Sequence, residues 1–207
     1  MSDKKIILVG YSGHGYVVAE AALLSGLALE FYTEFCEQKK NPFRLEYIGF
    51  EGAENFTGWY KDASFILGIG DNDLRFKVAR LISDKNKMTE TVIHPAASIA
   101  KDVLIGEGSF IARNASINPL ASVGKYCIVN TGAIIEHECV IEDGAHIAPG
   151  AVLAGNVTVG ERSFIGANAV ILQGVTIGKN VIVGAGTVVL KDISDNRKVV
   201  GNPGREL

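Results

Sequence analysis

A histidine between two glutamates is the clearest candidate for acid–base chemistry in this chain of 207 residues. His137 stands in the segment Ile135-Glu136-His137-Glu138-Cys139. Neutral imidazole accepts a proton at pH 7, and a carboxylate on the second ring nitrogen fixes the tautomer and raises the basicity of the ring. The pattern favours His137 as a general base beside a supporting glutamate, and a solvated polar surface is an equally good interpretation of the residue types alone.

Two glycine-rich turns near the N-terminus are candidate anion sites. Residues 10–15 join a predicted strand to a predicted helix, where free backbone amides bind phosphate groups. Their glycines are spaced GxxGxG, not GxGxxG as in dinucleotide-binding proteins, which favours a nucleotide-linked sugar over NAD. Residues 68–72 follow another predicted strand and are expected to line the same crevice. Ordinary tight turns remain the alternative for both segments.

A six-residue repeat must position His137. An aliphatic residue occupies every sixth position from 93 to 189 without an insertion, and a small residue usually follows four positions later. The series is Ile93, Ile99, Ile105, Ile111, Ile117, Val123, Val129, Ile135, Ile141, Ile147, Leu153, Val159, Ile165, Ile171, Ile177, Val183 and Val189. Such a repeat predicts a parallel β-helix, in which three hexapeptides make one triangular coil around an aliphatic interior.

The repeat also predicts the surroundings of the candidate base. Coils of 18 residues stack His137 between Pro119 and Gly155, and glycine leaves space beside the imidazole for two reactants. Neither His137 nor His146 occupies an inward position, so both are expected to face solvent or a partner. The repeat holds no long loop that could cover an active site. We therefore expect a neighbouring subunit of a homotrimer to form one wall of the site.

The N-terminal part of the chain follows a different pattern. Its apolar runs and turns predict strands over 6–9, 29–32 and 64–69, and helices over 16–25 and 73–83. The predicted fold is therefore a Rossmann-like βαβ domain over residues 1–90, followed by a left-handed parallel β-helix domain with a C-terminal tail over residues 91–207.

Composition argues against several other classes of protein. Lys and Arg total 20 against 23 Asp and Glu, with a net charge of −3 and no basic stripe for nucleic acid. The first apolar run is too short for a signal peptide or a membrane span, so a cytoplasmic protein is expected. The three cysteines lack zinc-site spacing. Two histidines in the central coils are too few for a three-histidine site like that of γ-type carbonic anhydrases, and no metal is expected.

With these motifs, the whole chain resembles the bacterial sugar acetyltransferases of the PglD and NeuD type. These include UDP-4-amino-sugar N-acetyltransferases and sialic acid O-acetyltransferase-like proteins, and they belong to the hexapeptide-repeat acyltransferase superfamily. The resemblance is carried by Ser12-Gly13-His14-Gly15, Ile135-Glu136-His137-Glu138-Cys139-Val140-Ile141, Ala154-Gly155-Asn156-Val157 and Gly201-Asn202-Pro203-Gly204-Arg205.

The resemblance implies a homotrimer that binds acetyl-CoA between adjacent β-helices. It implies acetyl transfer to the amino group of a nucleotide-linked amino-deoxy sugar, with UDP as the expected nucleotide, for surface-polysaccharide synthesis. By motif position, His137 corresponds to the general base and Glu138 to its supporting carboxylate. The residues expected to contact acetyl-CoA are His146, Gly155, Ala167 and Ala185. Those expected to contact the nucleotide sugar are Ser12, Gly13, His14 and Gly70.

The chain departs from the family pattern at two places. Paired aspartates that often follow the second strand are replaced by Tyr32-Thr33-Glu34-Phe35, where Glu34 is the expected substitute, and the segment 36–60 is longer than expected. O-acetylation of sialic acid or another sugar by the same base is the close alternative function. A non-catalytic scaffold that binds sugar nucleotides is the alternative of another class.

Overall fold

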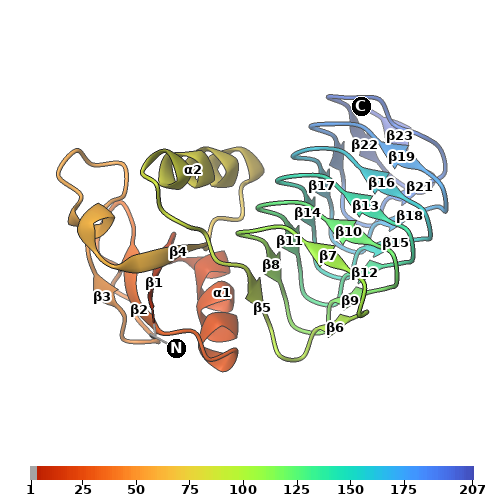
Figure 1. Cartoon of the computed structure of the whole chain (residues 1–207). Helices are drawn as coiled ribbons and strands as arrows, with labels where there is room; N and C mark the ends of the chain where they lie inside the picture. The colour runs from red at the N-terminus through yellow and green to blue at the C-terminus, as the bar shows by residue number, and fades with distance from the viewer. Residues whose placement is uncertain (1–3) are drawn as a thin grey trace.

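The computed structural model describes residues 4–207, as a small α/β unit followed by a tall stack of short strands (Figure 1). The elements of the first unit are β1 (Lys5–Val9), α1 (Gly13–Leu24), β2 (Leu29–Thr33), β3 (Glu46–Tyr47), the 3-10 helix η1 (Thr57–Tyr60), β4 (Ala63–Leu67) and α2 (Asn72–Asp84). Its four strands are parallel in the order β3-β2-β1-β4. This confirms the Rossmann-like prediction.

Helix α1 begins earlier than the sequence suggests. Its first residue is Gly13, and the amide of Tyr16 donates to the carbonyl of Ser12 at 2.9 Å. The predicted turn over residues 10–15 is therefore partly helical. Gly15 faces the carbonyl oxygen of Gly10 so closely that a Cβ at this position would collide with it. The glycine serves close packing of the helix on the loop.

The second unit is a parallel β-helix whose short strands coincide with the six-residue repeat. The strands are β5 (Val92–Ile93), β6 (Ser98–Ile99), β7 (Leu104–Ile105), β8 (Phe110–Ile111), β9 (Ser116–Ile117), β10 (Ser122–Val123), β11 (Ile128–Val129), β12 (Ile134–Ile135), β13 (Val140–Ile141), β14 (His146–Ile147), β15 (Val152–Leu153), β16 (Thr158–Val159), β17 (Phe164–Ile165), β18 (Val170–Ile171), β19 (Thr176–Ile177), β20 (Ile182–Val183) and β21 (Val188–Val189). Each of them ends on a member of the aliphatic series.

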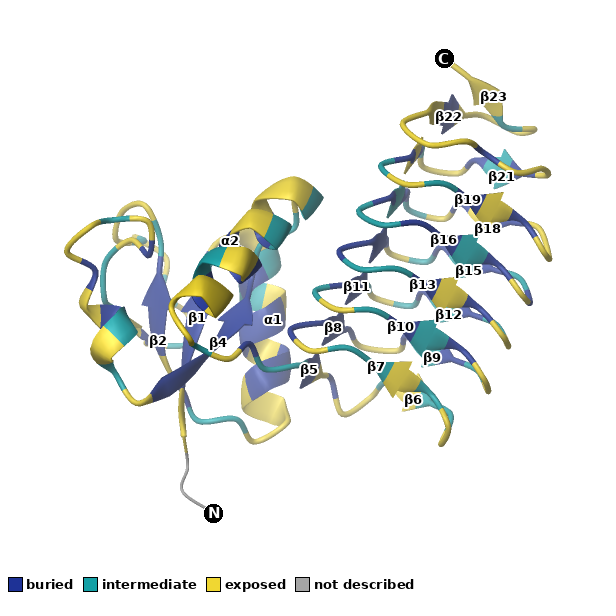
Figure 2. Ribbon diagram, turned by 45° about the horizontal axis from the view of Figure 1, so that its top comes forward, coloured by how far each residue is buried: buried dark blue, intermediate teal, exposed yellow. Residues whose placement is uncertain are grey.

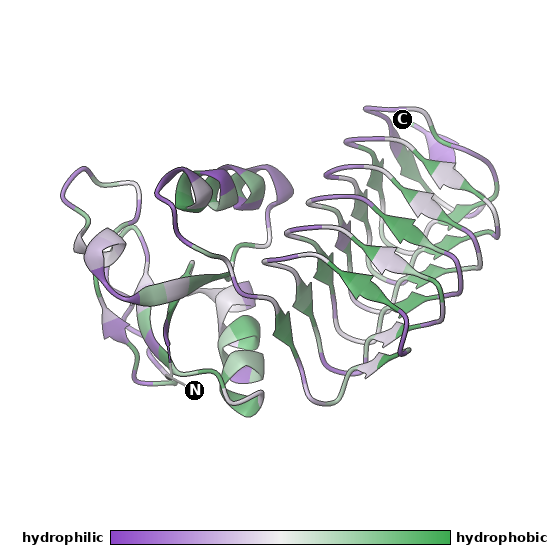
Figure 3. Cartoon of the chain, in the orientation of Figure 1, coloured by the Kyte–Doolittle hydropathy of each residue, from purple (hydrophilic) through white to green (hydrophobic). Residues whose placement is uncertain are grey.

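These strands form three faces, which we call the five-stranded, eight-stranded and six-stranded faces. Successive strands of a face pair in parallel at a spacing of one coil, so Ile135 lies between Ile117 and Leu153. From Ile111 to Val189 the aliphatic series is buried (Figure 2), while the turns carry the polar residues (Figure 3). The predicted β-helix is confirmed. Two further strands, β22 (Lys198–Val200) and β23 (Arg205–Glu206), pair antiparallel and close the eight-stranded face.

The two units share a hydrophobic core. Helix α1 packs between the small sheet and the lower end of the eight-stranded face, and its Val18 joins one buried cluster with Val92, Phe110 and Ile128. Helix α2 covers the opposite face of the sheet through Val78 and Ile82. Burial of each such side chain stabilises the fold by roughly 1.5–3 kcal/mol. This shared core fixes the N-terminal unit against the β-helix.

The helices over residues 4–207 are all too short or too polar to cross a membrane.

Candidate active site

His137 lies at the corner between the six-stranded and five-stranded faces, in the turn from β12 to β13. Its Nδ1 lies 3.0 Å from Oε2 of Glu138, and the two side chains are 51% and 57% exposed. Neighbouring side chains in a strand point to opposite sides, but Glu138 adopts a φ of 61° in the turn. The corner therefore brings the carboxylate to the imidazole. With Nδ1–H donating to Glu138, Nε2 keeps a free lone pair.

Gly155 forms the floor beneath the imidazole. It follows β15, one coil further along the β-helix, and a Cβ built on it would lie 2.5 Å from both Cε1 and Nε2 of His137. The amide of Asn156 donates to the carbonyl of His137 at 2.8 Å, which holds the two coils in register. The edge of the ring that carries Nε2 thus occupies space that exists because residue 155 has no side chain.

Substitution of Gly155 by alanine is expected to lower activity without lowering stability. The imidazole of His137 is half exposed and can swing away from the new methyl group, so the fold tolerates the change. A displacement of about 1 Å at a reacting group costs on the order of 10²-fold in rate. Steady-state kinetics and a thermal melt measure the two effects. An unchanged rate in this variant would show that the imidazole does not require a glycine beneath it.

A cavity of about 830 Å³ opens at the carboxyl ends of β1, β2 and β4. Four of the five predicted substrate residues line it, namely Ser12, His14, Glu34 and Gly70. Gly13 lies beside them at the start of α1 and is exposed. The volume suits a ligand of nucleotide size, and open parallel sheets bind ligands at this edge.

His146 lies on the eight-stranded face, where the N-terminal unit covers it. Only 7% of the residue is exposed, so the expectation that it faces solvent or a partner is wrong. Its Nδ1 lies 3.3 Å from the carbonyl oxygen of Gly70, its Nε2 lies 3.1 Å from Nδ2 of Asn130, and its ring centroid lies 6.3 Å from that of His14. The structure therefore places His146 behind Gly70 and His14, which line the cavity, and not beside His137, which lies at a corner of the β-helix.

Burial keeps both of these histidines neutral. Loss of solvent lowers the pKa of His146 to about 3, with smaller contributions from the charge of Arg75 and from His14. Loss of solvent also lowers the pKa of His14 to about 4, and Arg75 adds to the effect. Neither ring carries a charge at pH 7.

The two neutral rings are expected to make the fold sensitive to acid. The unfolded chain protonates each histidine below pH 6.5, whereas the folded chain resists protonation down to about pH 4 or 3, so stability falls as the pH is lowered through this window. At pH 5.5 each neutral ring lowers the free energy of unfolding by about 1 kcal/mol. Thermal melts at pH 7 and 5.5 should show a smaller acid shift in His146→Asn than in the wild type. Equal shifts would contradict the assignment.

The sequence did not reveal that Arg75 is buried beside the cavity, because an arginine in an amphipathic helix is expected at the surface. It is 1% exposed and crosses from α2 to the β-helix. Its guanidinium donates to the carbonyl oxygens of Tyr126 (2.8 Å), Gly144 (2.8 Å), Gly70 (3.1 Å) and Ile69 (3.2 Å), and to Oδ1 of Asn72 (2.9 Å). Burial lowers its pKa to about 10, so it remains charged at pH 7. It ties the cavity wall to the β-helix.

The other three residues expected to contact acetyl-CoA lie at two corners of one chain. Gly155 is at the corner of His137, between the six-stranded and five-stranded faces. Ala167 and Ala185 follow β17 and β20, at the corner between the eight-stranded and six-stranded faces, and Gly186 N donates to Ala167 O at 2.8 Å. A single chain does not bring these residues together, because the six-stranded face separates them.

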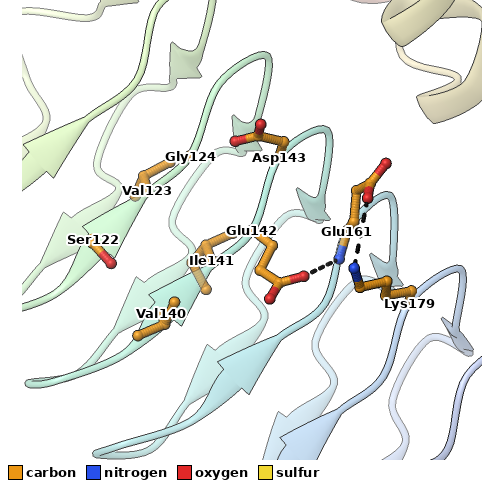
Figure 4. A pocket seen from close by; sticks show the side chains of 9 residues that line it. All are labelled: Ser122, Val123, Gly124, Val140, Ile141, Glu142, Asp143, Glu161 and Lys179. Atoms are coloured by element: carbon orange, nitrogen blue, oxygen red, sulfur yellow. Dashed lines mark hydrogen bonds and ion pairs between the residues drawn. The ribbon is translucent and has the colours of Figure 1, made fainter.

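A second, shallow groove of about 440 Å³ lies along the five-stranded face and the corner between this face and the eight-stranded face (Figure 4). Glu142 accepts from the amide of Glu161 at 3.0 Å, and Nζ of Lys179 lies 3.9 Å from Glu161. Lys179 and Glu161 thus form an ion pair across the groove, and no imidazole or thiol lines it. No group of three or more metal-ligating side chains occurs over residues 4–207.

Two family models match separate parts of the chain. Residues 5–82 match the PglD N-terminal domain, and residues 156–191 match the hexapeptide repeat of succinyl-transferase. UDP-N-acetylbacillosamine N-acetyltransferase of Bacillus subtilis is 33% identical over 118 residues, which is 52% of this chain and 51% of that relative. The match thus spans about half the length of this curated relative.

Solved structures are similar over nearly the whole chain. The acetyltransferase domain of PglB from Neisseria gonorrhoeae superposes with a TM-score of 0.93 at 32% identity, over 99% of this chain and 100% of that one. The same domain in complex with acetyl coenzyme A gives a TM-score of 0.92. PerB from Caulobacter crescentus, in complex with CoA and GDP-perosamine, gives 0.91 at 32% identity, over 98% of this chain and 97% of that one.

Proposed function

The chain belongs to the PglD-type family of bacterial sugar acetyltransferases, and from this premise we propose that it transfers the acetyl group of acetyl-CoA to the amino group of a nucleotide-linked amino-deoxy sugar. The observation that carries the proposal is the His137–Glu138 pair above Gly155, a half-exposed imidazole whose Nδ1 contacts the carboxylate and whose Nε2 keeps a free lone pair. The PglB domain is solved in complex with acetyl coenzyme A, and PerB in complex with CoA and GDP-perosamine.

In the proposed reaction His137 acts as general base. Its Nε2 takes a proton from the sugar amine as the amine nitrogen attacks the thioester carbonyl carbon. The tetrahedral intermediate then collapses, the C–S bond breaks, and CoA leaves as the thiolate. Glu138 holds Nδ1–H and stabilises the imidazolium that forms. The imidazolium then gives its proton to the CoA thiolate, so that both products are neutral at the reacting atoms.

The cavity of the N-terminal unit is the proposed nucleotide-sugar site. Backbone amides at the start of α1, around Ser12 and Gly13, suit the diphosphate. Glu34 follows β2, where an acidic residue of this fold accepts from ribose hydroxyls. His14 and Gly70 lie on the side of the cavity nearest the β-helix, toward which the sugar would extend.

A homotrimer would complete the site. The outer side of the six-stranded face carries partly exposed apolar residues, which another β-helix would cover; these are Ile134, Val152, Val170 and Val188. Such packing would bring the corner of Ala167 and Ala185 in one protomer to the corner of His137 in the next. Threefold symmetry closes this arrangement, and sedimentation measurements test it.

Radiolabelled acetyl-CoA tests the function directly. Incubation with amino-sugar nucleotides is expected to label the sugar, whereas sialic acid is expected to remain unlabelled. Label on sialic acid alone would replace N-acetylation by O-acetylation with the same base. Binding of a sugar nucleotide without label transfer to either acceptor would favour the scaffold alternative.

A further inference from the structure

The long segment 36–60 builds one wall of the cavity. Strand β3 pairs in parallel with β2, and the amide of Glu34 donates to the carbonyl of Gly49 at 3.2 Å. The chain then turns, and Phe50, Glu51 and Gly52 line the cavity beside Glu34 and Phe35. The ends of two neighbouring strands therefore each present one phenylalanine and one glutamate to the same space.

The two phenylalanines form an exposed aromatic rim. The ring centroids of Phe35 and Phe50 lie 5.6 Å apart with an angle of 66° between the planes. Phe35 is 79% exposed, an unusual state for so large an apolar side chain beside a cavity. Aromatic rings presented in this way stack on the flat faces of nucleobases.

Glu51 is a buried carboxyl at the cavity wall. It is 7% exposed and accepts from Oγ1 of Thr33 at 2.7 Å. Loss of solvent raises the pKa of Glu51, with a smaller contribution from the charge of Glu34. No lysine or arginine pairs with it over residues 4–207. A buried carboxylate has room for several donors, and a ligand that supplies them offsets the cost of burial.

Building on the proposed function, we propose that Phe35, Phe50 and Glu51 form the nucleobase subsite and select guanine over uracil, in place of the uridine nucleotide that the family resemblance implies. The diphosphate at α1 and the ribose at Glu34 direct the base toward the edge strand β3, where these three side chains lie. Guanine presents neighbouring N1–H and N2–H donors, which match a carboxylate. Uracil presents a single N3–H donor between two carbonyl oxygens. The negative charge of a carboxylate repels these two oxygens.

Calorimetric titration with GDP, IDP and UDP tests the subsite in the wild-type protein. The hypoxanthine base of IDP keeps the N1–H of guanine and lacks its amino group. GDP is expected to bind at least about tenfold more tightly than UDP, with IDP between them, because hydrogen bonds to a charged group account for this range. UDP binding as tight as GDP binding overturns the proposal.

Variants then assign the preference to residues. Glu51→Gln is expected to weaken GDP binding by about tenfold or more and to strengthen UDP binding, because the charge that repels the uracil carbonyl oxygens is lost, while Phe50→Ala weakens both nucleotides. Glu37→Gln, an exposed glutamate of the same segment outside the cavity lining, is the matched control. Unchanged GDP affinity in Glu51→Gln overturns the proposal. Binding without a base preference removes only this subsite, whereas failure to bind any nucleotide removes the proposed function as well.

Discussion

Replacement of His137 by alanine is expected to lower the rate of acetyl transfer by about 10²–10⁴-fold, which is the usual contribution of a positioned general base. The variant loses the nitrogen that accepts the amine proton, while the β-helix keeps its interior, because this side chain is half exposed at a corner. Acetyl-CoA binding is expected to survive. Initial rates at saturating substrate, together with calorimetric titration of acetyl-CoA, measure the two properties. In the wild type the rate should rise with pH through the neutral range.

Variants of the two glutamates next to His137 serve as comparisons for this result. Glu138→Gln keeps the size of the side chain but weakens the support of Nδ1, and a smaller loss of about 10–100-fold is expected. Glu136→Ala is the matched control, because the structure gives its carboxylate no contact with the imidazole. Full activity in His137→Ala would show that another group accepts the proton.

Replacement of Arg75 by methionine is expected to destabilise the protein by about 3 kcal/mol or more. Methionine fills a similar volume but leaves the carbonyl oxygens of Tyr126 and Gly144 buried without their donor. For a chain of this size the thermal midpoint should fall by roughly 6–12 °C. The KM for the nucleotide sugar should rise as well, because Gly70 of the cavity wall loses the same anchor.

Arg80→Met provides the comparison on the same helix. Arg80 is exposed and lies 4.9 Å from the ring of Phe76, so its loss should change stability by less than about 0.5 kcal/mol. Arg75→Lys keeps the charge but cannot reach five acceptors, and an intermediate loss is expected. A wild-type midpoint in Arg75→Met would mean that water or a rearranged backbone replaces the guanidinium.

The β-helix could be predicted almost residue by residue, because its contacts are periodic in the sequence. Ile135 pairs with residues one coil away in each direction, and every coil repeats the arrangement of the one before. The same periodicity placed Gly155 beside His137. A repeat of fixed length thus carries its own three-dimensional register.

Contacts between the two units could not be predicted in this way. His146 shows the outward position of its hexapeptide, but the sequence does not say that α1 and the Gly70 turn cover that face. The contacts of Arg75 are with residues far away along the chain, such as Tyr126 and Gly144. The position of Glu51 depends on β3, an edge strand of only two residues. Such residues have no periodic signal, and local patterns describe them only as charged.

The antiparallel pair β22–β23 at the top of the β-helix has a consequence for self-association. A stack of parallel coils ends in a row of unused backbone donors and acceptors, which would template the addition of another chain in the same direction. A strand that runs the opposite way occupies part of this row, and its reversed polarity cannot continue the stack. The closing hairpin therefore opposes end-to-end growth into fibres.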